Sequence, residues 1–469
     1  MEEIAALSAL ELLDAYRHRS LSPVEVLDTL AARIEELNPS LCAFITLCLD
    51  RARVEATRTE ADYGRGECAG PLAGLPFGVK DLFDSAGVRT TYGSPMFSGH
   101  VPAADAEAVR RARGAGAILV GKTQTHEFAW GITSVNEAMG TSRNPWAPDR
   151  ISGGSSGGSA VALATDMVPL AMGSDTGGSI RVPSSFCGTV GCKPSYARIA
   201  SAGLFPLAPS LDHPGPMART PADAALLFGV LTDRPSGDSA IGSEPADLHG
   251  TRIGLCADLH LVPLAPEIQD AFDAAVDAAA GLGAQLIEVS LPEATGAYAA
   301  FSQVQPCEVL QTHTSAGLYP ARREEYGSDV RGRLDFATTL TLADYLEGTV
   351  RREKLRAGFD RVFDEVDLVI TPVTAGPPAP IGHERVMHLG EEIEFRELVM
   401  SYTTPQDLAG LPACTVRAGF DALGVPTAVQ LTGPAFGDQR VLGAAQALYE
   451  ATAELQRRRP DSVAGTASS

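Results

Sequence analysis

The chain has 469 residues, of which 45% are hydrophobic, and it carries a formal net charge of −21. This length allows a large buried core, and no Pro/Gly-rich or charged linker divides the sequence, so we expect one large domain. The negative charge argues against nucleic acid or an anionic membrane as a partner, because both attract positive charge.

The first residues, Met1-Glu2-Glu3-Ile4, have neither the basic start nor the sustained apolar stretch of a secretory signal, and no run is long enough to span a bilayer. The eight cysteines are spread without C-x-x-C pairs, which is typical of small core residues in a reduced compartment. We therefore expect a cytoplasmic protein.

The predicted elements begin with amphipathic helices. Ser22-Pro23-Val24-Glu25 is a capping box with proline in the first turn, and Asn38-Pro39 is the predicted stop of that helix. Apolar β-prone runs then alternate with helical segments, which predicts an α/β fold with a mixed, twisted central sheet and helices on both faces. The expected strands are Cys42 to Leu47, Leu75 to Val79, Ala117 to Val120, Met167 to Met172, Ile253 to Cys256, Gln285 to Val289, Asp367 to Thr371 and Thr427 to Leu431. We expect the domain to span residues 1–460 and the polar residues 461–469 to form a disordered tail.

Lys80 ends the apolar segment Gly74-Leu75-Pro76-Phe77-Gly78-Val79-Lys80-Asp81. A strand that enters the core would bury this lysine, and burial lowers a lysine pKa from its reference value of about 10.4. A neutral lysine can accept a proton. The alternative for a lysine in this position is a solvated residue at a strand edge.

Two Ser/Gly-rich segments follow at a short distance, Gly153 to Ser159 and Gly173 to Arg181. Glycine allows positive φ and close backbone approach, so such a loop can direct several N–H donors at one point beside a serine nucleophile. Taken singly, each segment is equally typical of a flexible linker.

Together, the three segments resemble the amidase signature family, whose hydrolases use a Ser-Ser-Lys triad. The resemblance makes Ser179 the nucleophile, Ser155 the bridging serine and Lys80 the base, and it implies a cis peptide between Gly154 and Ser155. It extends through Cys187 to Pro194 and Ser210 to Thr220, and it implies a signature core at about residues 70–220 in the family fold.

The loop of the proposed nucleophile supplies the other expected site residues. The backbone N–H groups of Thr176, Gly177, Gly178 and Ser179 are the expected oxyanion donors. Asp175 and Arg181 flank the nucleophile, and we expect them to form an ion pair that braces the loop, with an ordinary surface pair as the alternative.

Two other motif matches are rejected. Gly116 to Thr123 satisfies G-x-x-x-x-G-K-[ST], but its variable positions are themselves an expected strand, and Asp105 to Arg113, before them, is an expected helix. Gly153 to Gly157 satisfies G-x-S-x-G, but the upstream segment Arg143 to Arg150 contains two prolines and no strand pattern.

The nine histidines include no H-E-x-x-H motif or dense His/Cys cluster, so we expect no metal, and we expect no cofactor. His126 and His213 lie in family-like segments and either line the site or are structural, whereas His383 and His388 fall in an expected loop and short helix. Asp407 stands where many relatives have asparagine, which would add negative charge near the pocket. Possible pocket residues are Tyr298, Gln305, His313, Tyr319 and Tyr326.

The sequence thus predicts an amide hydrolase that cleaves a small-molecule carboxamide to a carboxylate and ammonia or an amine through a serine acyl-enzyme. One alternative is the glutaminase subunit of a tRNA-dependent amidotransferase, which shares the triad and passes ammonia to a partner. The other is a catalytically inactive or ATP-binding protein. The amide substrate is the expected partner, and a homodimer is left open.

Overall fold

The computed structural model describes residues 2–67, 70–232 and 247–461. Eleven strands form one mixed sheet in the order β1-β3-β2-β4-β6-β5-β12-β13-β9-β7-β8, and β10 and β11 form a separate hairpin. β2 lies parallel to both β3 and β4, β7 lies parallel to both β8 and β9, and the pairings from β4 to β9 are antiparallel. The strands are β1 (Phe44–Leu47), β2 (Pro76–Lys80), β3 (Ile118–Thr123), β4 (Leu170–Asp175), β5 (Val190–Lys193), β6 (His213–Ala218), β7 (Arg252–Leu255), β8 (Gln285–Glu288), β9 (Leu368–Pro372), β10 (Arg385–His388), β11 (Glu391–Glu394), β12 (Ala413–Phe420) and β13 (Pro426–Thr432).

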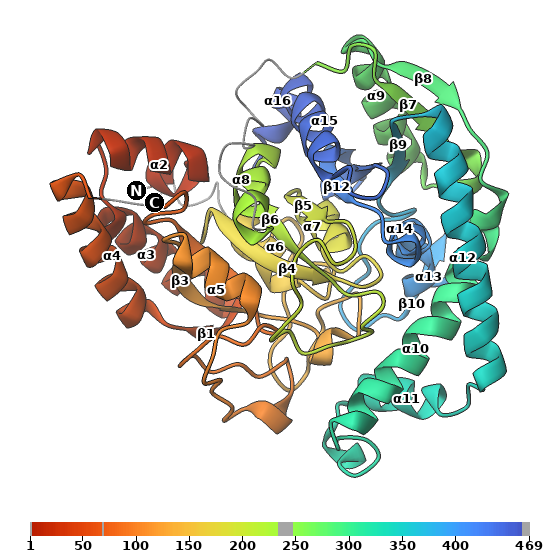
Figure 1. Cartoon of the computed structure of the whole chain (residues 1–469), viewed down its shortest axis with the longest axis horizontal. Helices are drawn as coiled ribbons and strands as arrows, with labels where there is room; N and C mark the ends of the chain where they lie inside the picture. Colours follow the sequence, from red (N-terminus) through yellow and green to blue (C-terminus); the bar gives the residue numbers. More distant parts are fainter. Residues whose placement is uncertain (1, 68–69, 233–246, 462–469) are drawn as a thin grey trace.

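Helices flank this sheet, so the predicted single-domain α/β fold with a mixed central sheet is confirmed (Figure 1). In Figure 1, α2 to α4 lie at the left edge, α10 to α12 at the right, and β4 to β6 with α6 and α7 between them. The helices are α1 (Glu2–Ala6), α2 (Ala9–His18), α3 (Pro23–Leu41), α4 (Leu49–Arg65), α5 (Glu107–Gly114), α6 (Gly157–Ala164), α7 (Arg181–Cys187), α8 (Pro221–Leu231), α9 (Pro266–Gly281), α10 (Ala297–Ser315), α11 (Ser328–Ala337), α12 (Leu342–Glu365), α13 (Phe395–Met400), α14 (Thr404–Ala409), α15 (Asp438–Ala451) and α16 (Ala453–Gln456).

Helix α3 shows how local sequence sets an element boundary. The Ser22 side chain accepts the Glu25 N–H and the Glu25 carboxylate accepts the Ser22 N–H, so the predicted capping box is present. The predicted stop at Asn38-Pro39 is wrong, because the helix continues to Leu41 with Pro39 inside it. Its last turn is closed by the Cys42 N–H, which donates to the Asn38 carbonyl.

All eight expected strands are present, with boundaries shifted by up to three residues, whereas β5, β6, β12 and the β10–β11 hairpin were not predicted. β6 contains Pro214, Gly215 and Pro216 in the middle of the sheet, residues that normally argue against a central strand. The loop and short helix expected around His383 and His388 are a correction: His388 ends β10, which pairs with β11.

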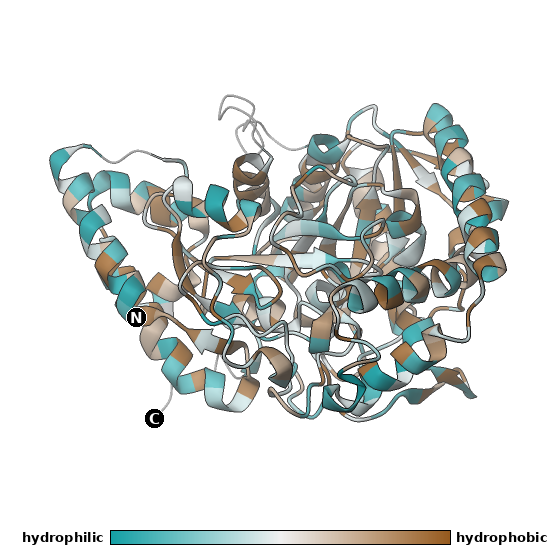
Figure 2. Cartoon of the chain, turned by 60° about the horizontal axis from the view of Figure 1, so that its bottom comes forward, coloured by the Kyte–Doolittle hydropathy of each residue, from teal (hydrophilic) through white to brown (hydrophobic). Residues whose placement is uncertain are grey.

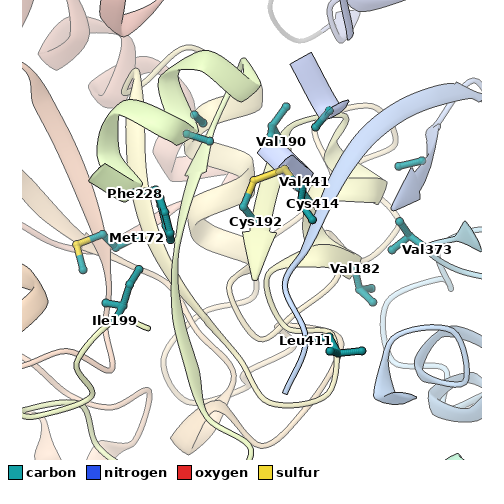
Figure 3. Packing of buried hydrophobic residues seen from close by; sticks show 14 of the residues in the cluster. Met172, Val182, Val190, Cys192, Ile199, Phe228, Val373, Leu411, Cys414 and Val441 are labelled. Atoms are coloured by element: carbon teal, nitrogen blue, oxygen red, sulfur yellow. A yellow bond between two sulfur atoms is a disulfide. The ribbon is translucent and has the colours of Figure 1, made fainter. Parts of the chain in front are cut away.

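The main core lies around the sheet, and the peripheral helices carry both hydrophobic and hydrophilic residues along their length (Figure 2). Figure 3 shows part of this core, with Cys192 of β5 and Cys414 of β12 joined by a disulfide. The expectation that the cysteines are all small reduced core residues is therefore wrong. Neither strand was predicted, and their antiparallel register places the two cysteines opposite each other with Cα atoms 4.1 Å apart.

In the described ranges, no helix is long and apolar enough to cross a membrane. Apart from Asp461, the predicted tail lies outside the described residues, and the boundary at residue 460 stays a prediction.

Candidate active site

A buried lysine and two serines meet beside the carboxyl ends of β2 and β4. Nζ of Lys80 lies 2.8 Å from Oγ of Ser155 and 2.9 Å from Oγ of Ser174. All three side chains are buried. Sequence reasoning paired Lys80 with Ser155 but missed Ser174, although Ser174 lies in the second Ser/Gly-rich segment.

The sheet explains why residues far apart in the chain meet here. β2 and β4 are adjacent and parallel, and Val79 of β2 is in register with Met172 of β4. The carboxyl ends of parallel strands lie at the same edge of a sheet, so Lys80 faces the residues at the end of β4. Ser155 follows a cis peptide bond from Gly154 and immediately precedes α6.

Lys80 has no exposed surface. Burial lowers the pKa of Lys80 to about 7, while the negative charges of Asp175 and Asp212 act to raise it. The amine is therefore partly neutral near pH 7, and a neutral amine next to a serine hydroxyl can accept its proton.

Ser179 lies in the turn between β4 and α7 and keeps a small exposed fraction of 6%. The Ser179 carbonyl accepts the Ser156 N–H at 3.1 Å, which joins the two serine loops. Within the described ranges, no hydrogen bond connects the Ser179 hydroxyl to Ser155.

Asp175 and Arg181 form a buried ion pair at the base of the Ser179 loop. The Asp175 carboxylate accepts the Arg181 Nε–H at 3.0 Å and the backbone N–H groups of Gly178 and Ile180 at 2.6 and 3.1 Å. Burial acts to raise the pKa of Asp175, but Arg181 outweighs this effect and lowers it. The loop is thus folded around a charged carboxylate.

This arrangement corrects one expected oxyanion donor. The Gly178 N–H donates to Asp175, so it is not available to a substrate. The N–H groups of Thr176, Gly177 and Ser179 donate to no acceptor in the part of the chain that the structure describes. These three can serve the substrate.

Both glycines of the loop are required by their surroundings. Gly178 has a φ of +124°, and a Cβ there would lie 2.5 Å from Oγ1 of Thr403. A Cβ on Gly177 would lie 2.5 Å from Phe301 of α10 and 2.7 Å from Met400 of α13. Sequence reasoning did not find Phe301, Met400 or Thr403, because they reach the loop from distant parts of the chain.

Asp407 and His213 lie on the far side of the Arg181 guanidinium. Oδ2 of Asp407 accepts from Nη2 of Arg181 at 2.6 Å, and Nδ1 of His213 lies 3.5 Å from Oδ1 of Asp407. Burial raises the pKa of Asp407 well above its usual range, and burial lowers that of His213. Asp407 therefore belongs to the support of the loop and does not line the cavity described below.

A cavity of about 530 Å³ lies next to the Ser155 loop and is lined by residues that include His126, Thr133, Asp329, Arg333 and Arg396. None of Lys80, Ser155 and Ser179 lines it, but a Cβ on Gly154 would lie 3.0 Å from the backbone nitrogen of Thr133. Nε2 of His126 is 2.8 Å from Oδ2 of Asp329, and burial lowers the pKa of His126 despite this partner.

The five suggested pocket residues do not line this cavity. Gln305 accepts the Trp130 indole N–H, and His313 lies 2.8 Å from the Tyr326 hydroxyl. Tyr319 donates to Asp335, and Tyr298 packs against the main core.

Both rejected motifs have the structure that excludes them. Strand β3 runs through the variable positions and the Gly121-Lys122-Thr123 end of the phosphate-loop match, and the buried Lys122 amine donates to Thr90 Oγ1 at 2.9 Å and to the Phe83 carbonyl. No strand precedes the G-x-S-x-G match, where Arg143 and Arg150 make only isolated bridges.

Comparison with known proteins agrees with this architecture. The Amidase family profile matches residues 25–442. The A subunit of glutamyl-tRNA(Gln) amidotransferase from Roseiflexus sp. (strain RS-1) is 34% identical over 478 residues, covering 96% of each chain. An amidase of known crystal structure is 34% identical with a TM-score of 0.86, covering 95% of this chain and 99% of its own. The crystal structure of the corresponding glutamyl-tRNA(Gln) amidotransferase chain from Thermotoga maritima is 28% identical with a TM-score of 0.78, covering 95% of each chain.

The fold and these similarities define an enzyme that hydrolyses non-peptide carbon–nitrogen bonds. The chain belongs to the amidase signature family, as its sequence motifs predicted.

Proposed function

We propose that the chain hydrolyses a carboxamide through Ser179, Ser155 and Lys80. Ser179 Oγ attacks the amide carbonyl, its proton passes through the Ser155 hydroxyl to neutral Lys80, and the protonated site then delivers a proton to the leaving nitrogen. Ammonia or an amine departs, and water hydrolyses the acyl ester on Ser179. The observation that carries this proposal is the buried Lys80 amine, 2.8 Å from the Ser155 hydroxyl.

The charge that develops on the carbonyl oxygen needs hydrogen-bond donors fixed in advance. The N–H groups of Thr176, Gly177 and Ser179, which have no acceptor among the described residues, supply them beside the nucleophile. One donor of this kind is typically worth about 10²–10³ in rate. Asp175 and Arg181 hold the loop in shape without touching the reacting atoms.

The cavity beside Thr133 is the proposed place for the rest of the substrate. Two of its arginines, Arg333 and Arg396, each have a buried N–H group without an acceptor among the described residues, at Nη1 and Nε respectively. A buried donor without an acceptor is costly, and a carboxylate would satisfy both. These groups therefore favour an amide substrate that also carries a carboxylate.

Two candidates fit this chemistry: a stand-alone amidase and the glutaminase subunit of a tRNA-dependent amidotransferase. Glutamine carries both the side-chain amide and the carboxylate. Relatives named as the A subunit of glutamyl-tRNA(Gln) amidotransferase, at 33–36% identity over nearly the whole chain, support the glutaminase subunit better than the stand-alone enzyme. Solved amidases of similar fold keep the stand-alone enzyme as the other candidate.

The test is ammonia release from a panel of carboxamides that includes glutamine, with Ser179→Ala as the inactive control. The panel is run on the purified chain alone and again with the remaining subunits of a glutamyl-tRNA(Gln) amidotransferase. Release from glutamine that requires those subunits favours the glutaminase subunit, whereas turnover of other amides by the chain alone favours the stand-alone enzyme. Activity that survives in Ser179→Ala would overturn the proposed mechanism.

A further inference from the structure

The oxyanion loop is held from the side by a residue that takes no part in the proposed proton transfer. Thr176 is the first residue after β4, and its N–H is one of the three donors left for the substrate. The Thr176 hydroxyl donates to Oδ1 of Asp212 at 2.7 Å, and both side chains are buried. This bond ties the threonine side chain to a fixed point outside the loop.

Asp212 is itself tightly held. Its Oδ2 accepts the Leu207 N–H at 2.9 Å, and its Oδ1 also accepts the Ala208 N–H at 3.1 Å. The same turn is anchored at Ser210, whose backbone N–H donates to Glu308 of α10 and whose carbonyl accepts from Arg352 of α12. The oxyanion loop is thus connected through Asp212 to the α10–α12 pair.

Asp212 also acts on Lys80 through its charge. The charged groups that influence Lys80 are Asp175 and Asp212, whose carboxylates both act to raise the Lys80 pKa. Burial raises the pKa of Asp212 to about 6, against the bonds from Thr176, Ala208 and Leu207, and the nearby Glu308 adds to the increase. At neutral pH, Asp212 is therefore a carboxylate.

We infer that Asp212 is a positioning residue for acyl transfer at Ser179. It holds Thr176 so that the N–H of residue 176 faces the carbonyl oxygen of the acyl group, and its negative charge favours the protonated form of Lys80. It touches neither the substrate nor the reacting atoms and works through these two residues. This inference rests on the proposed function.

The test uses a fluorophosphonate, which needs no knowledge of the natural substrate. The serine hydroxyl displaces fluoride from phosphorus, and the phosphoryl oxygen is expected to occupy the oxyanion site. The second-order rate of Ser179 labelling is measured by mass spectrometry between pH 5 and 10. The variants are Thr176→Val, Thr176→Ser and Asp212→Asn, with Asp223→Asn as a control. Asp223 is a buried carboxylate that accepts a backbone N–H from Leu10, away from the loop.

Thr176→Val removes the bond to Asp212, so the high-pH labelling rate should fall at least about tenfold, whereas Thr176→Ser keeps the hydroxyl and should stay within about threefold of wild type. Asp212→Asn should also slow labelling and, because a negative charge near Lys80 is lost, move the midpoint of the rate rise to lower pH. Thr176→Val and Asp223→Asn should leave that midpoint in place.

Several outcomes overturn the inference. A Thr176→Val protein that labels as fast as wild type excludes the positioning role, and this variant decides the question if Asp212→Asn does not fold. An unchanged midpoint in folded Asp212→Asn excludes the effect on Lys80. If wild-type Ser179 is not labelled at any pH, the proposed function fails together with the inference, whereas normal wild-type labelling with unaffected variants removes only the inference.

Discussion

Nζ of Lys80 and Oγ of Ser155 lie 2.8 Å apart, although 75 positions separate the residues in the chain, and neither side chain is exposed. A lysine in this setting has two opposite effects. Its burial provides the neutral amine that proton transfer needs, and the same burial makes the protonated form costly to the folded state.

The first prediction concerns the pH dependence of catalysis. Burial lowers the pKa of Lys80 to about 7, so kcat/KM for any amide substrate should rise with pH through about 7 and then level off. His126→Ala and His213→Ala should keep this rise, because neither histidine contacts Lys80 or the two serines. If a histidine variant loses the rise while Lys80→Ala retains it, a histidine is the base.

The second prediction is that Lys80→Met loses activity but gains stability. The folded pKa of Lys80 is depressed below its unfolded value, so its cost is full below about pH 7 and disappears only as the pH approaches the unfolded value. At pH 7, the variant should unfold with a free energy higher by roughly 1–3 kcal/mol, measured by urea denaturation. Activity should fall at least about 1,000-fold. A destabilised variant would contradict this account of Lys80.

The third prediction is non-additivity within the triad. Ser179→Ala, Ser155→Ala and Lys80→Ala should each lower kcat/KM by about 1,000-fold or more, and the triple variant should lose little beyond Ser179→Ala, because residues that act as a unit are not additive. Ammonia release with the most active amide of the panel measures all four. Penalties that multiply would mean that the three residues act separately.

The fourth prediction separates two carboxylates that share Arg181. Asp175→Asn should destabilise by about 3–5 kcal/mol, because Asp175 binds the guanidinium and two loop N–H groups. Asp407→Asn should cost less than about 1 kcal/mol at pH 5 and become relatively more stable as pH rises. The folded pKa of Asp407 is raised, so its contribution to stability is present at low pH and lost as pH rises through that pKa. Thermal unfolding at pH 5, 7 and 9 checks both, and equal losses in the two variants at every pH would contradict the distinction.

The fifth prediction tests the Cys192–Cys414 disulfide. Peptide mapping without reductant should recover the two cysteines as one linked pair. The bond closes a loop with a sequence separation of 222, so Cys414→Ala should lower the free energy of unfolding by about 2–5 kcal/mol in oxidising buffer. Cys187→Ala, a buried free cysteine nearby in the chain, is the matched control. Two free thiols at positions 192 and 414 in the native protein would exclude the disulfide.

The sequence predicted the strands whose apolar runs are continuous, and it missed those whose composition contradicts their position. β6 is the clearest case, because Pro214 and Pro216 are tolerated in a central strand only by the particular register that the fold imposes. The helix past Pro39 was missed for the same reason, since propensity is local and the contacts that overrule it are not.

The local part of the site could be predicted, and the remote part could not. The two Ser/Gly loops and Lys80 are short motifs, so their residues are recognisable in the chain. The Gly178 N–H was assigned to the substrate because nothing in the sequence says that the neighbouring Asp175 side chain turns back to take it. Phe301, Met400 and Asp212 come from outside these motifs, and only the tertiary fold brings them to the loop.

The pairing of β2 with β4 makes the site depend on counting along a strand. Side chains alternate between the two faces of a sheet, so deleting one residue of β2 before Lys80 would turn the amine away from Ser155 while leaving an equally apolar strand in place. Evolution of this chain can therefore lengthen or shorten its surface loops with little penalty, but an insertion or deletion of a single codon within β2 would produce a folded protein without a base.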